Sequence, residues 1–116
     1  MSVLLNSKDF LIVFERAIDI CSEYFNVSRS SILSKDSKRV ITDIKKLIVY
    51  KFYNLKRHSK DNLVNLISEQ FNCGHSNVVY WYNKAKELYS SDSDFRESYT
   101  LFSKKLDDYI KNSKIS

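Results

Sequence analysis

The stretch DNLVNLISEQFNCGHSNVVYWYNKAKELY, residues 61–89, decides the fold. Its apolar residues recur at the three- and four-residue steps of a helix on both sides of the short polar segment 72–74. Gly74 is the only glycine of the chain, and we expect it to supply the positive φ that a tight turn between helices needs. The stretch therefore predicts a helix-turn-helix, with Asp61 capping the first helix and the second beginning at His75.

The same periodicity predicts further helices on either side of this stretch. The expected elements are a helix from about Ser7 to Phe25, a short turn capped by Ser28, a long helix from about Ser37 to Leu55, and a last helix that Asp92 caps and that frays from Lys111 onward. No internal repeat or linker divides the chain. We therefore expect one all-α domain over residues 1–116, a compact bundle of five to six helices with its core in 8–112.

The composition excludes several classes of protein. One Gly and no Pro in 116 residues argue against a β-sandwich or barrel, and they exclude the glycine-rich phosphate loops of nucleotide-binding proteins. No apolar run approaches the length of a membrane span, and two cysteines make no disulfide framework. The expectation is a cytoplasmic protein without cofactor, nucleotide or membrane partner.

Positive charge is concentrated in one part of the chain. The net charge is +5, yet residues 35–60 alone hold nine basic and two acidic side chains. This concentration is an electrostatic footprint for a polyanionic partner, and a solvated helix face is the alternative interpretation that a charge run by itself leaves open. The basic residues of the segment are Lys35, Lys38, Arg39, Lys45, Lys46, Lys51, Lys56, Arg57 and Lys60.

The start of the second helix of 61–89 carries the candidate site. In a helix-turn-helix the first turn of the second helix enters the DNA major groove. Here that helical turn presents His75, Ser76 and Asn77, which can reach base edges. Lys84, two turns on, can meet a phosphate. Tyr80 and Trp81 either flank the groove or pack against the last helix, whereas core packing is the interpretation for Val78, Tyr82 and Ala85.

Two segments carry a resemblance to a known family. The run from Phe71 to Val79 with the later Lys84, and the upstream steps 24–27 and 32–35, resemble the C-terminal DNA-binding domain (domain IV) of the bacterial replication initiator DnaA. The resemblance spans about residues 17–110. It implies a helix-turn-helix fold of the Trp-repressor-like kind and sequence-specific binding to double-stranded DNA. Origin recognition, replication control or transcription regulation at the nucleoid would be the role.

The resemblance also implies residue roles. His75 and Ser76 stand where the family reads bases or phosphates, and Asn77 replaces a threonine there. Lys45 replaces an arginine of the long helix that reaches DNA. Together with the basic residues noted above, the candidate backbone or minor-groove contacts are Lys35, Lys38, Arg39, Lys45, Lys46 and Lys84. Gly74 replaces an aspartate in the turn.

Other functions have less support. Cys73 and His75 lie close in sequence, but no further Cys or His completes a zinc spacing, so no metal site is expected. No nucleophile, base and acid stand in a catalytic pattern, and an enzyme is not predicted. The alternative is a small basic adaptor that binds an acidic protein partner, such as replication or host machinery, without reading bases. RNA is the weaker third choice, because its A-form major groove excludes a helix.

Overall fold

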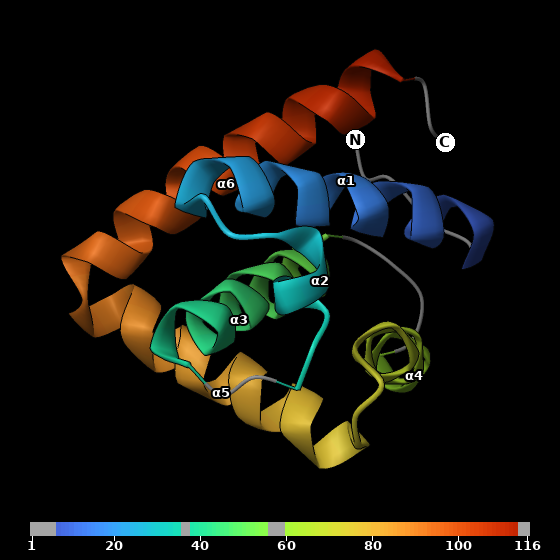
Figure 1. Cartoon of the computed structure of the whole chain (residues 1–116), viewed down its shortest axis with the longest axis horizontal. Helices are drawn as coiled ribbons and strands as arrows, with labels where there is room; N and C mark the ends of the chain where they lie inside the picture. Colours follow the sequence, from blue (N-terminus) through green and yellow to red (C-terminus); the bar gives the residue numbers. More distant parts are fainter. Residues whose placement is uncertain (1–6, 36–37, 56–59, 114–116) are drawn as a thin grey trace.

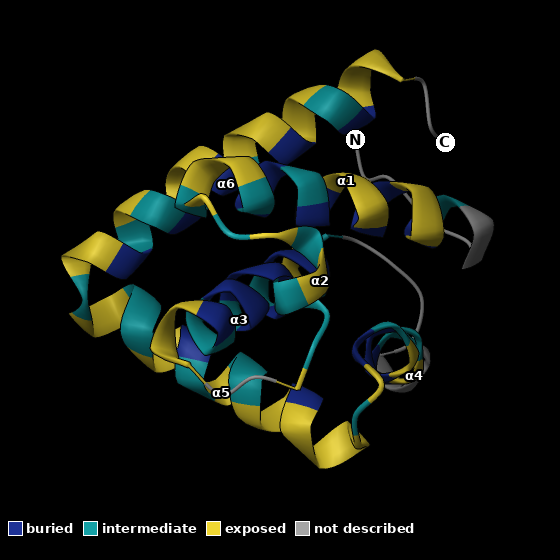
Figure 2. Cartoon of the chain, in the orientation of Figure 1, coloured by how far each residue is buried: buried dark blue, intermediate teal, exposed yellow. Residues whose placement is uncertain are grey.

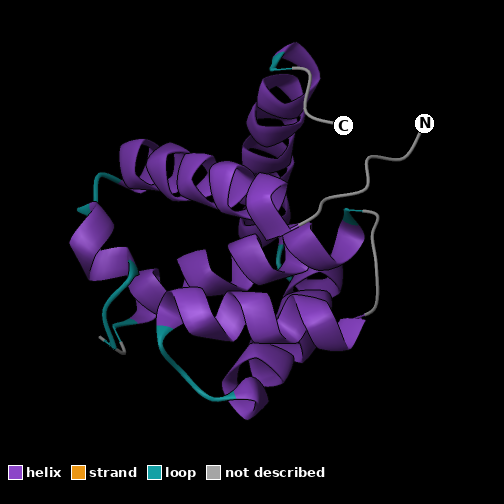
Figure 3. Cartoon of the chain, turned by 90° about the vertical axis from the view of Figure 1, so that its right-hand side faces the viewer, coloured by secondary structure: helices purple, strands orange, loops and turns teal. Residues whose placement is uncertain are grey.

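The computed structural model of the chain describes residues 7–35, 38–55 and 60–113, with the backbone alone at 7, 8 and 60–62 (Figure 1). Within these residues the chain forms six helices and no strand, which confirms the predicted all-α bundle (Figure 3). The helices are α1 (Ser7–Phe25), α2 (Arg29–Ile32), α3 (Arg39–Asn54), α4 (Lys60–Phe71), α5 (His75–Ser91) and α6 (Ser93–Asn112).

The helix ends follow from local chemistry. The Ser28 hydroxyl accepts a hydrogen bond from the Ser31 amide and starts α2, while the Asp92 carboxylate accepts from the Asp94 and Phe95 amides and starts α6. Both caps were predicted. α4 begins at Lys60, so Asp61 lies inside the helix rather than capping it. The predicted start at Ser37 and the connector 56–59 lie outside the described residues.

Helix α3 occupies the centre of the bundle and contacts each of the other five helices. α1 and α6 pack together on one side of α3, α5 packs on the other side, and α4 crosses the end of the bundle near the start of α5 (Figure 1). The buried faces of these helices turn toward α3 (Figure 2).

The buried side chains form one core cluster. Four phenylalanine rings lie at its heart, with Phe14 at 5.5 Å from Phe10, 5.9 Å from Phe52 and 5.3 Å from Phe71 between ring centroids. They join α1, α3 and α4 by contacts in the favourable distance range for aromatic pairs. Most predicted apolar positions are buried, but Val40, in the first turn of α3, is 39% exposed.

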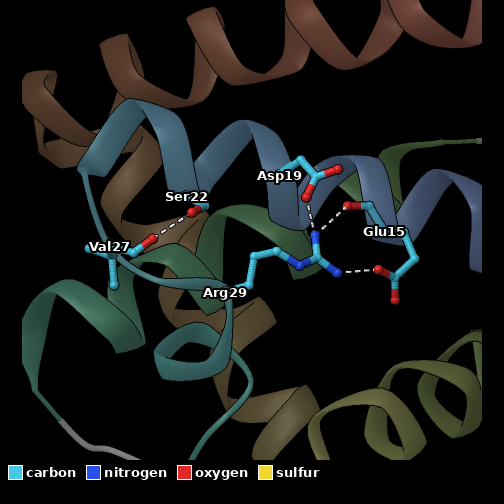
Figure 4. Close-up of polar contacts among 5 residues, drawn as sticks. All are labelled: Glu15, Asp19, Ser22, Val27 and Arg29. Atoms are coloured by element: carbon cyan, nitrogen blue, oxygen red, sulfur yellow. Dashed lines mark hydrogen bonds and ion pairs between the residues drawn. The ribbon is translucent and has the colours of Figure 1, made fainter.

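Helix α2 is tied to α1 by polar contacts (Figure 4). The Arg29 guanidinium forms ion pairs with Glu15 and Asp19 on α1. The Ser22 hydroxyl donates to the Val27 carbonyl at 2.6 Å, just before α2 begins. These contacts fix the start of α2 against α1.

No helix within the described ranges is both long enough and apolar enough to cross a lipid bilayer.

Candidate functional site

The turn between α4 and α5 has a different geometry from the predicted one. Asn72, not Gly74, has a positive φ, at 51°. The Cys73 amide donates to the Ser68 carbonyl at 3.0 Å and the Asn72 amide donates to the Glu69 carbonyl at 3.3 Å, the paired bonds of a Schellman helix end. Asparagine tolerates this left-handed conformation.

Gly74 instead precedes α5 as its N-cap, with φ −80° and ψ 160°. This is extended backbone that any residue adopts. The expectation of a positive φ at Gly74 is therefore wrong, because the left-handed residue that ends α4 comes two positions earlier.

The three predicted base-reading residues, His75, Ser76 and Asn77, are all exposed in the first turn of α5. No acidic residue lies in this turn, and Gly74 has no side chain to cap the helix, so the helix N-terminus keeps its positive electrostatic character. His75 Nε2 lies 2.7 Å from Asn65 Oδ1, which links the imidazole to α4. The turn therefore offers polar groups beside amides that can receive an anion.

Three of the predicted backbone-contacting residues line one open pocket between α3 and α5. Arg39 and Lys46 come from α3 and Lys84 comes from α5. Each of these cations lies close to a carboxylate. Asp43 Oδ2 lies 3.7 Å from Arg39 Nε, and Asp43 Oδ1 lies 3.4 Å from Lys46 Nζ. Lys84 Nζ lies 3.5 Å from Glu87 Oε1. Arg39 and Lys84 make surface pairs of small energy, which leave these two cations available to an external anion, whereas the Lys46 side chain is only 15% exposed.

Two further predicted cations, Lys35 and Lys38, are exposed in the segment between α2 and α3. Burial raises the pKa of the Cys73 thiol, and the charges of Lys45 and Lys35 act against this rise. The positive charge of Lys35 therefore acts electrostatically on Cys73 in the α4–α5 turn.

Lys45 lies in a different environment from the other five cations that were predicted to contact the DNA backbone or minor groove. It is only 4% exposed. Its Nζ donates to the Ser34 carbonyl at 2.6 Å and lies 5.4 Å and 5.3 Å from the ring centroids of Phe71 and Trp81. The expectation that Lys45 reaches the DNA backbone does not hold, because its charged end is enclosed by the protein.

Lys51 is also internal, at 5% exposed, and its Nζ contacts Ser103 Oγ and Asp107 Oδ1 on α6, both at 2.7 Å. The basic segment 35–60 therefore presents fewer charges to solvent than its composition suggests. Lys56 and Arg57 lie outside the described residues, as does the side chain of Lys60.

The aromatic residues of α5 divide between surface and packing. Tyr80 is 54% exposed. Trp81 packs edge-on against Phe71 of α4 at 5.7 Å, rather than against the last helix. Val78 and Ala85 are fully buried, as predicted, and half-buried Tyr82 stacks on Tyr53 of α3 at 4.1 Å.

The two cysteines lie in different parts of the molecule. Cys21 is fully buried in the core and Cys73 is half-buried in the turn, and both are free. Among the described side chains no three His, Cys, Asp or Glu residues lie close enough together to hold a metal ion.

The candidate site thus consists of the first turn of α5, the pocket between α3 and α5, and the exposed cations that precede α3. Asn77 and Lys84 are seven residues apart on α5 and so lie on the same side of the helix, which joins the first turn to the pocket. No protein-family model matches this chain, and no curated protein or solved structure matches it significantly.

Proposed function

We propose that this protein binds double-stranded DNA, with α4 and α5 acting as a helix-turn-helix and the first turn of α5 entering the major groove. The observation that carries the proposal is the exposure of His75, Ser76 and Asn77 together at a helix start free of acidic residues. These side chains have the donors and acceptors that base edges require, and an asparagine can pair with adenine through two hydrogen bonds.

The cations around α5 support the same proposal. Lys35, Lys38 and Arg39 precede or begin α3 and are exposed, and Lys46 and Lys84 line the pocket with Arg39. These five cations can neutralise phosphates on both sides of a DNA groove. The resemblance to DnaA domain IV adds a role in replication control or transcription regulation, at the nucleoid in the cytoplasm.

The first experiment selects bound sequences from a random duplex pool and measures affinity by fluorescence anisotropy between 50 and 200 mM salt. Contacts to five phosphates predict that log K falls with log salt with a slope of about −4 to −5. The absence of duplex binding at about 50 mM salt would contradict the proposal.

Substitutions in the first turn of α5 test base reading. His75→Ala and Asn77→Ala are expected to cost about 1–3 kcal/mol on the selected site and little on random duplex. The matched control is Asn83→Ala, an exposed asparagine further along α5. Equal losses on the selected and random duplexes would argue against base contacts from this turn.

A second candidate is an acidic protein partner, and one observation favours it. Val79 and Tyr80 are 43% and 54% exposed beside the first turn of α5, and such apolar surface is typical of protein contacts. Val79→Ser with Tyr80→Ser would then abolish capture of that partner, while DNA affinity would be weak and independent of sequence. Strong preference for one duplex sequence would exclude this candidate as the main function.

A further inference from the structure

Lys45 joins three parts of the candidate site from the inside. Its ammonium meets the carbonyl of Ser34 in the α2–α3 loop, the ring of Phe71 at the end of α4, and the ring of Trp81 in α5. Ser34 directly precedes Lys35, and Phe71 and Trp81 lie on either side of the α4–α5 turn. One buried charge therefore touches both the loop that carries an exposed cation and the two helices that present the first turn of α5.

The geometry of these contacts stabilises the buried ammonium of Lys45. Each ring centroid lies within the 6 Å range in which a cation over an aromatic face is stabilised, and tryptophan is the best such partner. The 2.6 Å bond to the Ser34 carbonyl is charge-assisted. Phe71 and Trp81 also contact each other edge-on, at 5.7 Å, so the ammonium lies against a preformed aromatic corner.

We propose that Lys45 is a positioning residue, whose buried ammonium holds the α2–α3 loop against the α4–α5 turn and so sets where Lys35 stands relative to the first turn of α5. The inference rests on the proposed function for its effect on DNA, but the geometry of the contact can be tested without DNA. It assigns Lys45 a role distinct from that of the exposed lysines, since its buried ammonium contacts the Ser34 carbonyl and two aromatic rings.

The DNA experiment compares Lys45→Met with Lys35→Met, with Lys105→Met on α6 as the matched exposed control. We expect Lys45→Met to lower affinity for the selected duplex about tenfold and to lower the ratio of selected to random affinity. The slope of log K against log salt should stay at its wild-type value. Lys35→Met should instead reduce the magnitude of that slope by about 0.9, as loss of one phosphate contact requires.

Two outcomes would overturn the proposal. A reduction of the slope by about 0.9 in Lys45→Met would mean that Lys45 contacts a phosphate directly. Unchanged affinity together with a lower unfolding temperature would mean that Lys45 serves stability alone. Circular dichroism before each titration establishes that the variants are folded.

A measurement on the wild-type protein keeps the inference falsifiable if Lys45→Met does not fold, or if no duplex binds. Trp81 is the only tryptophan, so its indole signals in NMR spectra are unambiguous. We expect the side-chain protons next to Lys45 Nζ to be shifted upfield by the two rings and to show nuclear Overhauser contacts to the Trp81 indole. In Trp81→Leu the shift should diminish. A Lys45 side chain with the signals of an exposed lysine would overturn the inference, whereas failure of duplex binding alone would overturn the proposed function.

Discussion

At the scale of single residues, lysines of one helix differ in what surrounds them. Lys46 lines a surface pocket, whereas Lys45 and Lys51 on the same helix are 4% and 5% exposed. Lys51 reaches from α3 to Ser103 and Asp107 on α6, so its charge belongs to the contact between two helices. A count of basic residues therefore overstates the positive surface of α3.

The Lys51 site yields a prediction about stability. Asp107→Ala should lower the free energy of unfolding by about 1–3 kcal/mol, because it leaves a buried ammonium with only a hydroxyl partner. Lys51→Met should cost less, about 1 kcal/mol, because it removes the charge and nearly keeps the volume. Urea unfolding of both variants measures the order.

The matched control for this pair is Asp108→Ala. Asp108 makes a surface pair with Lys104 at 3.6 Å, and its removal should change stability by at most about 0.5 kcal/mol. If Lys51→Met were more destabilising than Asp107→Ala, the attraction between Lys51 and its partners would outweigh the cost of burying the charge, contrary to this account.

At the scale of elements, the α4–α5 turn depends on which residue adopts the left-handed conformation. Asn72 has φ 51° and Gly74 has φ −80°, so substitution by alanine should be costly at Asn72 and nearly neutral at Gly74. A Cβ added at Gly74 would come no closer than 3.9 Å to the nearest atom outside its neighbours, Ser76 Oγ. The glycine is therefore not required by space or by backbone conformation.

Alanine substitutions in this turn give the corresponding prediction. Asn72→Ala should lower the free energy of unfolding by about 1 kcal/mol, because alanine is strained at positive φ, while Asn72→Gly should be neutral or stabilising. Gly74→Ala should change it by at most about 0.5 kcal/mol, since a small loss of capping offsets the gain in unfolded-state entropy. Thermal and urea unfolding measure all three, and a larger loss for Gly74→Ala than for Asn72→Ala would contradict the observed geometry.

Much of the element order could be predicted because it depends on local sequence. The apolar period predicts the helices, and Ser28 and Asp92 mark the starts of α2 and α6 by side-chain capping that the sequence reveals. Other features depend on three-dimensional packing. Helix α5 continues to Ser91, past the predicted end near Tyr89. Arg39 and Lys84 line the same pocket although 45 positions separate them in the sequence.

The buried lysines were missed although a signal existed. Lys45 follows Ile41 by four residues and precedes Ile48 by three, while Lys51 follows Leu47 by four, so both lie at positions of the apolar stripe of α3. A lysine can extend from such a position along its aliphatic stem. Whether an aromatic corner or a carboxylate then receives the ammonium depends on helices distant in sequence, which periodicity does not place.

At the scale of the whole molecule, a cluster of tyrosines joins the three helices α3, α5 and α6. The tyrosine cluster comprises Tyr50, Tyr53, Tyr82, Tyr89 and Tyr99 from α3, α5 and α6. Tyr50 is its centre, at 5.5 Å from Tyr89 and 5.0 Å from Tyr99 between ring centroids, and Asn54 donates to the Tyr99 hydroxyl at 3.3 Å. The rings hold α5 and α6 to the central helix, with Tyr99 buried and the other four tyrosines half-buried.

This cluster predicts a loss of stability at alkaline pH. Burial raises the pKa of Tyr50 above 10, and the neighbouring Tyr82 and Tyr89 raise it further; burial also raises the pKa of Tyr99, against hydrogen bonds from Asn54 and Ser103 that lower it. Above about pH 10 the unfolded chain loses these protons first, so the folded state binds more protons than the unfolded state. The stability that the neutral hydroxyls provide is thus fully present below pH 10 and is lost as the pH rises through the folded pKa values.

Urea unfolding between pH 8 and pH 11 checks this dependence. The free energy of unfolding of the wild-type protein should fall above about pH 10, by at most about 1.4 kcal/mol per pH unit for each tyrosine that titrates late. Tyr50→Phe and Tyr99→Phe keep the rings and remove the protons, so each should flatten the alkaline decline. Tyr24→Phe, at a residue 45% exposed and outside the cluster, is the matched control for lysine deprotonation and other effects of high pH. If the free energy of unfolding of Tyr50→Phe and Tyr99→Phe fell with pH as steeply as that of Tyr24→Phe, titration of the tyrosine cluster would not be the cause of the alkaline loss of stability.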